Sequence, residues 1–226
     1  IELTGGGEPM VYPYIREFLE ELAKYPIELA IVTNGASLNT QTQSSLKNLK
    51  WMRFSVDAAT AGTHKQVHRV PESVFPIVLK HIEEVVARKF EDCKIGISFV
   101  ITKHNYHEIE QAAVLYKSLG VASVRYTFIY DPEGRGAMDS DEIDEAEQAL
   151  NRARGLQDES FKVFGTMRRL EFYSQPNTDF DFCGYQFFTW AIGYDGVVYP
   201  CCIMKYHKGF GLGDLRTQSL NNIVYS

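Results

Sequence analysis

The sequence has few cysteines, no excess of basic residues and no long apolar run, and each of these absences excludes a class of protein. Four cysteines in 226 residues are too few for a disulfide framework. With 23 Lys and Arg against 29 Asp and Glu, the net charge is −6, so we expect no nucleic-acid partner. No apolar run approaches the ~20 residues of a membrane span. No N-terminal signal is seen either, and we therefore expect a cytoplasmic protein without a membrane partner.

Apolar residues make up 45% of the chain, enough for the core of one α/β domain and a small appendage. Runs rich in β-branched and aromatic residues predict strands, and the amphipathic segments between them predict helices. Strands are expected at Ile1–Thr4, Ile27–Val32, Trp51–Val56, Lys94–Ile101 and Ser123–Tyr130, and helices at about residues 10–24, 39–49, 72–89, 105–118 and 139–153. This alternation indicates a parallel sheet in a barrel, a partial barrel or a doubly wound fold.

Polar or glycine-rich residues follow four of the five predicted strands. They are Thr4–Glu8, Thr33-Asn34-Gly35, Ser55 with Asp57, and Thr102–Asn105. In all three candidate folds ligands bind at the carboxyl ends of the strands. We therefore expect these residues to converge on one site.

The first of these loops, Thr4-Gly5-Gly6-Gly7-Glu8-Pro9, has an acidic residue and no lysine. It also lacks the Gly-x-Gly-x-x-Gly spacing of a phosphate loop, so its carbonyls and Glu8 suit a cation such as an ammonium group. On chemistry alone a tight structural turn is an equal alternative, because glycine-rich turns between strands and helices are common.

The pattern changes after about Gly155, and we expect residues 156–226 to form a separate unit. Two short strands around Tyr194-Asp195-Gly196 predict a β-hairpin, and a short closing helix is expected from Ser219. Three of the four cysteines, Cys183, Cys201 and Cys202, fall within this unit, and such clustering favours a metal site.

The ordered strand ends of residues 1–135 resemble those of the radical S-adenosylmethionine enzymes. The motifs are Gly-Gly-Glu-Pro, Thr33-Asn34-Gly35, Ser55-Val56-Asp57 and the run from Ile97 to Asn105. The resemblance implies a partial (β/α)6 TIM-like barrel over residues 1–155, lacking its first βα unit. It implies that Gly6, Gly7 and Glu8 hold the methionine ammonium, and that Ser55 and Arg69 contact ribose hydroxyls or carboxylate. Asn34 and Asp57 join this cofactor-binding set, although Asp57 equally suits a helix cap.

The C-terminal unit resembles the auxiliary-cluster domains called SPASM or twitch. Cys183 is followed after twelve residues by Gly196, and Cys201 follows after four more. Thiolates bind iron–sulfur clusters or zinc, which makes Cys183, Cys201 and Cys202 the candidate metal ligands. If the strand continues, Cys201 and Cys202 point to opposite faces, so only one of them easily shares a metal with Cys183.

Two cysteine sets of these families are missing from the sequence: the Cys-x3-Cys-x2-Cys motif of the catalytic [4Fe-4S] cluster, and the later cysteines of the auxiliary domain. We expect the chain to be the middle of a longer enzyme, inactive by itself, with an incomplete C-terminal domain. By the resemblance, the whole enzyme reductively cleaves S-adenosylmethionine, with an electron donor such as flavodoxin or ferredoxin. The resulting 5′-deoxyadenosyl radical abstracts hydrogen from a peptide or a small-molecule substrate.

Other residues with chemical potential have a structural interpretation, and no residue is assigned as catalytic. Cys93 is expected to be a structural thiol, and Arg125 is expected to place a charge near the pocket. Surface or packing roles are expected for His64, His68, His104 and His107. Two alternatives to an enzyme remain: a non-catalytic S-adenosylmethionine-binding module, and a zinc-stabilised α/β protein.

Overall fold

The computed structural model describes residues 1–129, 138–165 and 182–225. The chain divides into two compact units, Ile1–Ser174 and Gln175–Ser226, and each is described by itself. Tyr130, the predicted end of the fifth strand, lies outside the described residues. In the part that is described, no helix is long and apolar enough to cross a membrane.

The first unit contains a six-stranded sheet in which every strand is parallel to its neighbour and the strands follow chain order. The strands are β1 (Glu2–Leu3), β2 (Leu29–Thr33), β3 (Leu49–Ser55), β4 (Lys94–Ile101), β5 (Ser123–Phe128) and β6 (Lys162–Phe164). In this register Ser55 of β3 pairs with Ser98 of β4, and Ser98 pairs with Arg125 of β5. These three residues therefore form one row across the middle of the sheet.

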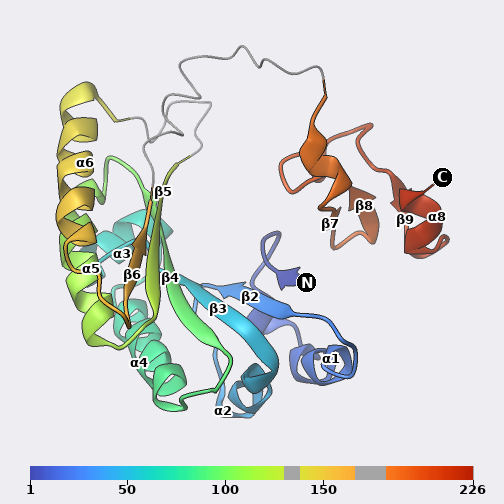
Figure 1. Cartoon of the computed structure of the whole chain (residues 1–226), viewed down its shortest axis with the longest axis horizontal. Helices are drawn as coiled ribbons and strands as arrows, with labels where there is room; N and C mark the ends of the chain where they lie inside the picture. The colour runs from blue at the N-terminus through green and yellow to red at the C-terminus, as the bar shows by residue number, and fades with distance from the viewer. Residues whose placement is uncertain (130–137, 166–181, 226) are drawn as a thin grey trace. The chain divides into compact units, whose positions relative to one another are not determined.

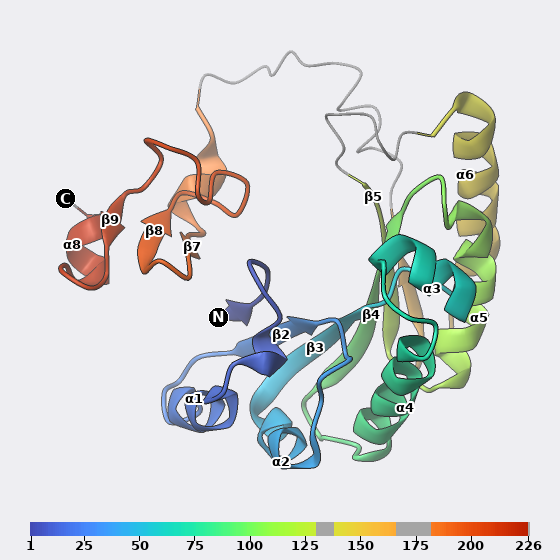
Figure 2. The ribbon, with the colours of Figure 1, turned by 180° about the vertical axis from the view of Figure 1, so that it is seen from behind.

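Helices cover one side of the curved sheet, as the two views of the chain show (Figures 1 and 2). They are α1 (Ile15–Leu22), α2 (Thr40–Gln43), α3 (Ala61–His68), α4 (Val74–Ala87), α5 (Ile109–Ser118) and α6 (Ser140–Arg154), with short 3-10 helices η1 (Pro9–Val11), η2 (Ser44–Asn48) and η3 (Tyr106–Glu108). The α/β architecture of successive parallel strands joined by helices is thus confirmed.

The alternation of side chains along the strands separates a core face from an open face. In β3, Met52 and Phe54 are fully buried beneath the helices, whereas Trp51, Arg53 and Ser55 point the other way and are partly exposed. The core therefore lies between the sheet and its helices, and the open face carries polar and charged side chains.

Two elements of the first unit, among the residues that the structure describes, were missed by the sequence pattern. Helix α3 has little apolar periodicity, since its buried residues are Thr63 and His64. Strand β6 has three residues with only Val163 buried, and it extends the first sheet by pairing with β5. The expected boundary at residue 155 is therefore too early, because a strand this short gives no alternation to recognise.

The second unit contains a three-stranded antiparallel sheet and a closing helix. Strands β7 (Ala191–Ile192) and β8 (Val197–Tyr199) form the predicted hairpin, and β9 (Gly213–Asp214) pairs with β8. Gly196 takes a φ of 76° in the turn, a conformation that glycine adopts without steric cost. The unit ends in α8 (Leu220–Val224), whose N-cap is the predicted Ser219.

Gly35, directly after β2, provides a test of this packing. It has a φ of +74°, and a Cβ there would lie 2.7 Å from the Phe54 ring. We expect Gly35→Ala to lower the free energy of unfolding by about 2–4 kcal/mol, from backbone strain and overpacking. Gly62→Ala is the matched control, because nothing lies within 4 Å of that added Cβ. Urea unfolding followed by circular dichroism measures both, and equal midpoints for the two variants would contradict this packing.

Candidate cofactor site at the carboxyl edge of the sheet

Glu8 joins the ends of the first two strands. Its Oε1 accepts hydrogen bonds from Met10 N at 3.0 Å and from the Thr33 hydroxyl, and its Oε2 accepts one from Asn34 N at 2.7 Å. A carboxylate has about four acceptor positions, so this set leaves one on Oε2. Glu8 therefore holds the ends of the two strands together, and one acceptor position on its Oε2 atom stays free for a ligand.

The glycine loop in front of Glu8 is exposed and conformationally unusual. Gly5, Gly6 and Gly7 have φ values of 63°, 76° and 156°, which side-chain-bearing residues rarely adopt. None of the three forms a backbone hydrogen bond with another described residue. Their peptide carbonyls are consequently free to accept hydrogen bonds in the loop that leads into Glu8.

Asn34 lies at the same edge, after β2, and is exposed. Its Oδ1 accepts a hydrogen bond from Ala36 N at 2.9 Å, which closes the turn after the strand. The Nδ2 group has no partner among the described residues, so the side chain holds the turn and still offers a donor.

Ser55 ends β3 on the open face, and its hydroxyl has no hydrogen-bond partner in the part of the chain that the structure describes. Asp57 behaves differently. Its Oδ1 accepts from Val100 N at 2.6 Å, its Oδ2 lies 3.3 Å from Nε2 of His68, and only 8% of the residue is exposed. Asp57 therefore ties β3 to β4 and α3. The cap interpretation is wrong, because Thr60 is the N-cap of α3.

Buried polar groups from the β4–α5 segment hold the turn that follows Asp57. The Asn105 amide donates to the carbonyls of Asp57 and Val100, at 2.8 and 2.9 Å. The Glu108 carboxylate accepts from Ala59 N and from the hydroxyls of Thr60 and Thr63, both at 2.7 Å. Sequence reasoning missed Glu108, whose partners lie 45 to 49 residues away along the chain.

Two histidines of α3 pack against each other behind this turn, with ring centroids 4.7 Å apart. Burial and the charge of His68 lower the pKa of His64 to about 4. Burial opposes the charging of His68, but hydrogen bonds to Asp57 and the Val56 carbonyl, together with the Asp57 charge, raise the pKa of His68. His68 thus connects α3 to the end of β3, in agreement with a packing role.

Arg69 follows α3 in the left-handed conformation, with φ 56°. Its side chain is exposed and lines a shallow depression with Lys65, Val70 and Glu72. The backbone lies near the end of β3, because the adjacent His68 reaches the Val56 carbonyl at 2.9 Å. No contact joins Arg69 to Ser55 in the described structure, so its role towards a cofactor stays a prediction.

The cysteines of the second unit are free thiols. Cys183 is exposed at the start of η4 (Gly184–Phe187), and Cys201 and Cys202 lie in the turn after β8. The expectation that these two alternate in a strand is therefore wrong, because β8 ends at Tyr199. Among the described residues no three potential metal ligands are gathered in one place.

A [4Fe-4S] cluster is held by four thiolates, and residues 183–225 contain three cysteines. The fourth, Cys93, is buried in the first unit, where burial raises the pKa of its thiol to about 11. These residues therefore do not form a complete cluster site, and we assign no step to a cluster bound here.

Comparison with known proteins finds a domain match and several relatives of this chain. Residues 183–226 match the SPASM family, described as an iron-sulfur cluster-binding domain. Mycofactocin maturase MftC of Mycobacterium ulcerans is 30% identical over 135 residues, which are 59% of this chain and 35% of that protein. The S-adenosylmethionine-dependent nucleotide dehydratase of Flammeovirga pacifica is 30% identical over 107 residues, 46% of this chain and 36% of that protein. The chain thus spans about a third of the length of these curated relatives.

Solved structures share the fold. SuiB of Streptococcus suis bound to S-adenosylmethionine superposes with a TM-score of 0.75 at 16% identity, covering 98% of this chain and 53% of that one. SuiB bound to its precursor peptide SuiA gives a TM-score of 0.73, also at 16% identity, over 98% of this chain and 53% of SuiB.

The first unit is thus an α/β fold whose parallel sheet has a polar carboxyl edge, and residues 183–226 match an iron–sulfur cluster-binding domain. Residues 183–226 match the SPASM domain, and the chain is similar to a maturase and to an S-adenosylmethionine-dependent dehydratase, in agreement with the resemblance of its strand ends to the radical S-adenosylmethionine enzymes. The SPASM description agrees with the predicted iron–sulfur cluster, and SuiB, which shares the fold, was solved with S-adenosylmethionine bound.

The opposite pKa shifts of the two α3 histidines predict a maximum of stability near pH 6.5. His64 has a folded-state pKa of about 4 against 6.5 unfolded, so stability rises with pH between these values. His68 has a raised folded-state pKa, so its contribution is complete below 6.5 and is lost as the pH rises through that pKa. Urea unfolding at a series of pH values measures both slopes.

His64→Leu should remove the acid-side slope, and Asp57→Asn should remove the alkaline one. His107→Gln is the control, because this histidine is exposed, and both slopes should persist in it. A His64→Leu profile that follows the wild-type profile below pH 6.5 would show that His64 is not the titrating group.

Proposed function

We propose that the chain is the S-adenosylmethionine-binding and substrate-facing part of a radical enzyme that modifies a peptide. The observation that carries the proposal is a set of free hydrogen-bonding groups at the carboxyl edge of the sheet. The glycine loop carbonyls, the remaining acceptor of Glu8 and the Ser55 hydroxyl lack protein partners among the described residues. Such groups at the strand ends of an α/β sheet are typical of a ligand site.

In this proposal the ligand's ammonium group binds the carbonyls of Gly6 and Gly7 and the Oε2 atom of Glu8. Ser55 and Asn34 donate hydrogen bonds to ribose hydroxyls or to the carboxylate, and Arg69 supplies a positive charge to that carboxylate. Asp57 does not need to touch the ligand, because its carboxylate fixes the turn that presents Ser55. The protein contributes binding, orientation and exclusion of water, as in other cofactor enzymes.

The radical chemistry comes from groups that these residues do not hold by themselves. With a reduced cluster and an external electron donor such as flavodoxin or ferredoxin, S-adenosylmethionine supplies a 5′-deoxyadenosyl radical that abstracts hydrogen. Because the Cys-x3-Cys-x2-Cys motif is not in the sequence, the residues described here are assigned to binding and positioning only. Cys183, Cys201 and Cys202 are proposed to contribute some of the ligands of an auxiliary cluster in the SPASM domain.

A peptide substrate is supported by the relatives. MftC is named as a maturase, and SuiB has been solved with its precursor peptide. The nucleotide dehydratase shows that a similar sequence also occurs in a protein named for a small-molecule substrate. We favour the peptide because SuiB matches 98% of this chain in fold, against 46% of the chain for the dehydratase in sequence.

Calorimetric titration of the anaerobically prepared full-length protein with S-adenosylmethionine tests the site. We expect Ser55→Ala and Glu8→Gln each to weaken binding about five- to tenfold, roughly one lost hydrogen bond each. Ser37→Ala and Glu83→Gln are matched controls at exposed positions, and both should bind like the wild type. Wild-type affinity in the Ser55 and Glu8 variants would show that the site lies elsewhere. Thermal melting of Glu8→Gln separates lost binding from a loosened loop.

A further inference from the structure

Two arginines on the open face of the sheet have no counter-ion. Neither Arg53 of β3 nor Arg125 of β5 forms a hydrogen bond or an ion pair with any described residue. Arg53 instead lies over the ring of Trp51, with its guanidinium carbon 4.6 Å from the ring centroid. A stacked guanidinium is held in place while its donors stay free.

The sheet register brings the two arginines to the same small area. Arg53 pairs with Gly96 on β4, Arg125 pairs with Ser98 on β4, and these partners are two residues apart. With strands about 4.8 Å apart and about 3.3 Å per residue along a strand, the two Cα atoms are roughly 12 Å apart. Both long side chains can therefore reach one group placed above Gly96 and Ser98.

The electrostatics agree with this geometry. Burial lowers the pKa of Arg53, the charge of Arg125 lowers it further, and Glu2 acts in the opposite direction. Glu2 forms no ion pair with Arg53 in the described structure. Two like charges held this close on a partly covered surface favour an anion between them.

The floor of this area is shaped by Gly96 and by hydroxyl groups. A Cβ at Gly96 would lie 2.8 Å from the Ser123 hydroxyl, so glycine keeps the space between the arginines open. The Ser98 side chain lies on this face, beside Arg125 in the sheet, and has no hydrogen-bond partner in the described part of the chain. The guanidinium groups and serine hydroxyls of this area can all donate hydrogen bonds, and no carboxylate of the described residues accepts them there, which suits a carboxylate ligand.

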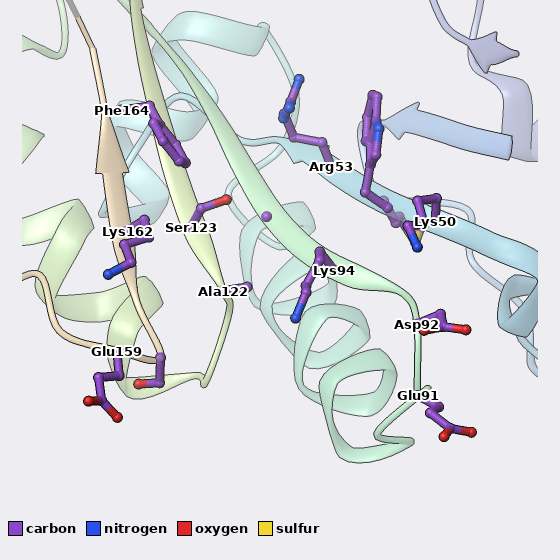
Figure 3. Close-up of a pocket in the computed structure, with 14 residues that line it drawn as sticks. Lys50, Arg53, Glu91, Asp92, Lys94, Ala122, Ser123, Glu159, Lys162 and Phe164 are labelled. Carbon is purple, nitrogen blue, oxygen red and sulfur yellow. The ribbon is translucent and has the colours of Figure 1, made fainter. Parts of the chain in front are cut away.

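A pocket of about 470 Å³ continues from Arg53 towards the amino ends of the strands (Figure 3). Its walls include Trp51, Lys94, Lys162 and Phe164. Figure 3 shows Arg53, Lys94 and Lys162 around it on β3, β4 and β6. Glu91, Asp92 and Glu159 also line the pocket, so it carries charges of both signs. A pocket with aromatic rings and mixed charges suits the polar and apolar residues that flank an acidic side chain in a peptide.

We propose that Arg53 and Arg125 form an anion site that binds a carboxylate of the substrate, an Asp or Glu side chain of a peptide. This assignment rests on the proposed function, because it takes the open face to be the substrate side. The cofactor's own carboxylate is the rival source of the same chemistry. We favour the substrate because Arg125 lies four strands from the glycine loop that follows β1, roughly 19 Å across the sheet.

Two labelled synthetic peptides, Gly-Ser-Glu-Ser-Gly and Gly-Ser-Gln-Ser-Gly with blocked termini, test the site by fluorescence anisotropy on the full-length protein. We expect the Glu peptide to bind about five- to tenfold more tightly at low salt. Arg53→Gln and Arg125→Gln should each remove most of that preference, whereas Arg125→Lys should retain part of it. Arg16→Gln, at an exposed arginine on α1, is the matched control and should keep the preference.

Equal binding of the two peptides by the wild-type protein would overturn the proposal. So would a loss of S-adenosylmethionine affinity in Arg53→Gln and Arg125→Gln, because the pair would then hold the cofactor's carboxylate. Failure of the proposed function is separate from these results. A protein that prefers the Glu peptide but does not bind S-adenosylmethionine supports the anion site and refutes the radical enzyme.

Discussion

The carboxylate of Glu108, buried with 4% of the residue exposed, is the constraint on which the rest of the site depends. A buried charge is costly unless hydrogen bonds satisfy it, and Glu108 is satisfied by one backbone amide and two threonine hydroxyls at the start of α3. These bonds fix the turn between β3 and α3. Ser55 and Asp57 lie before this turn in the chain, and His68 and Arg69 lie at the end of α3 after it, so one glutamate from a distant segment orders the β3–α3 part of the candidate cofactor site.

The division of the sheet into a packed face and an open face determines what the molecule can bind. Helices α1 to α6 lie on one face of the sheet. The other face keeps Trp51, Arg53, Lys94 and Arg125 without a covering helix in the described structure. Its carboxyl edge has free acceptors at the glycine loop, which suit an ammonium, and its middle has free donors, which suit a carboxylate. The proposed ammonium site and the proposed substrate-carboxylate site therefore lie at different places on a single surface.

The sequence predicted those parts of the fold that depend on local pattern. Strand β4 has the predicted limits, because large apolar residues recur at every second position from Ile95 to Ile101. Helix α3 was missed because its stability comes from Glu108 and Thr60 rather than from an apolar stripe. The bracing roles of Glu8 and Asp57 could not be predicted either, since their partners become neighbours only when separate strand ends meet. The prediction that Cys201 and Cys202 point to opposite faces required β8 to continue through them, but β8 ends at Tyr199 and both cysteines lie in the turn that follows.

The central claim is that the full-length protein performs radical chemistry with S-adenosylmethionine. The most direct measurement is 5′-deoxyadenosine formation by the anaerobic, iron-loaded protein after reduction with dithionite, with iron and sulfide quantified in the same sample. The account predicts at least one cluster per chain and release of 5′-deoxyadenosine together with methionine. A zinc-containing protein, or one with less than one cluster per chain and no 5′-deoxyadenosine, would contradict it and favour a binding module that shares only the fold.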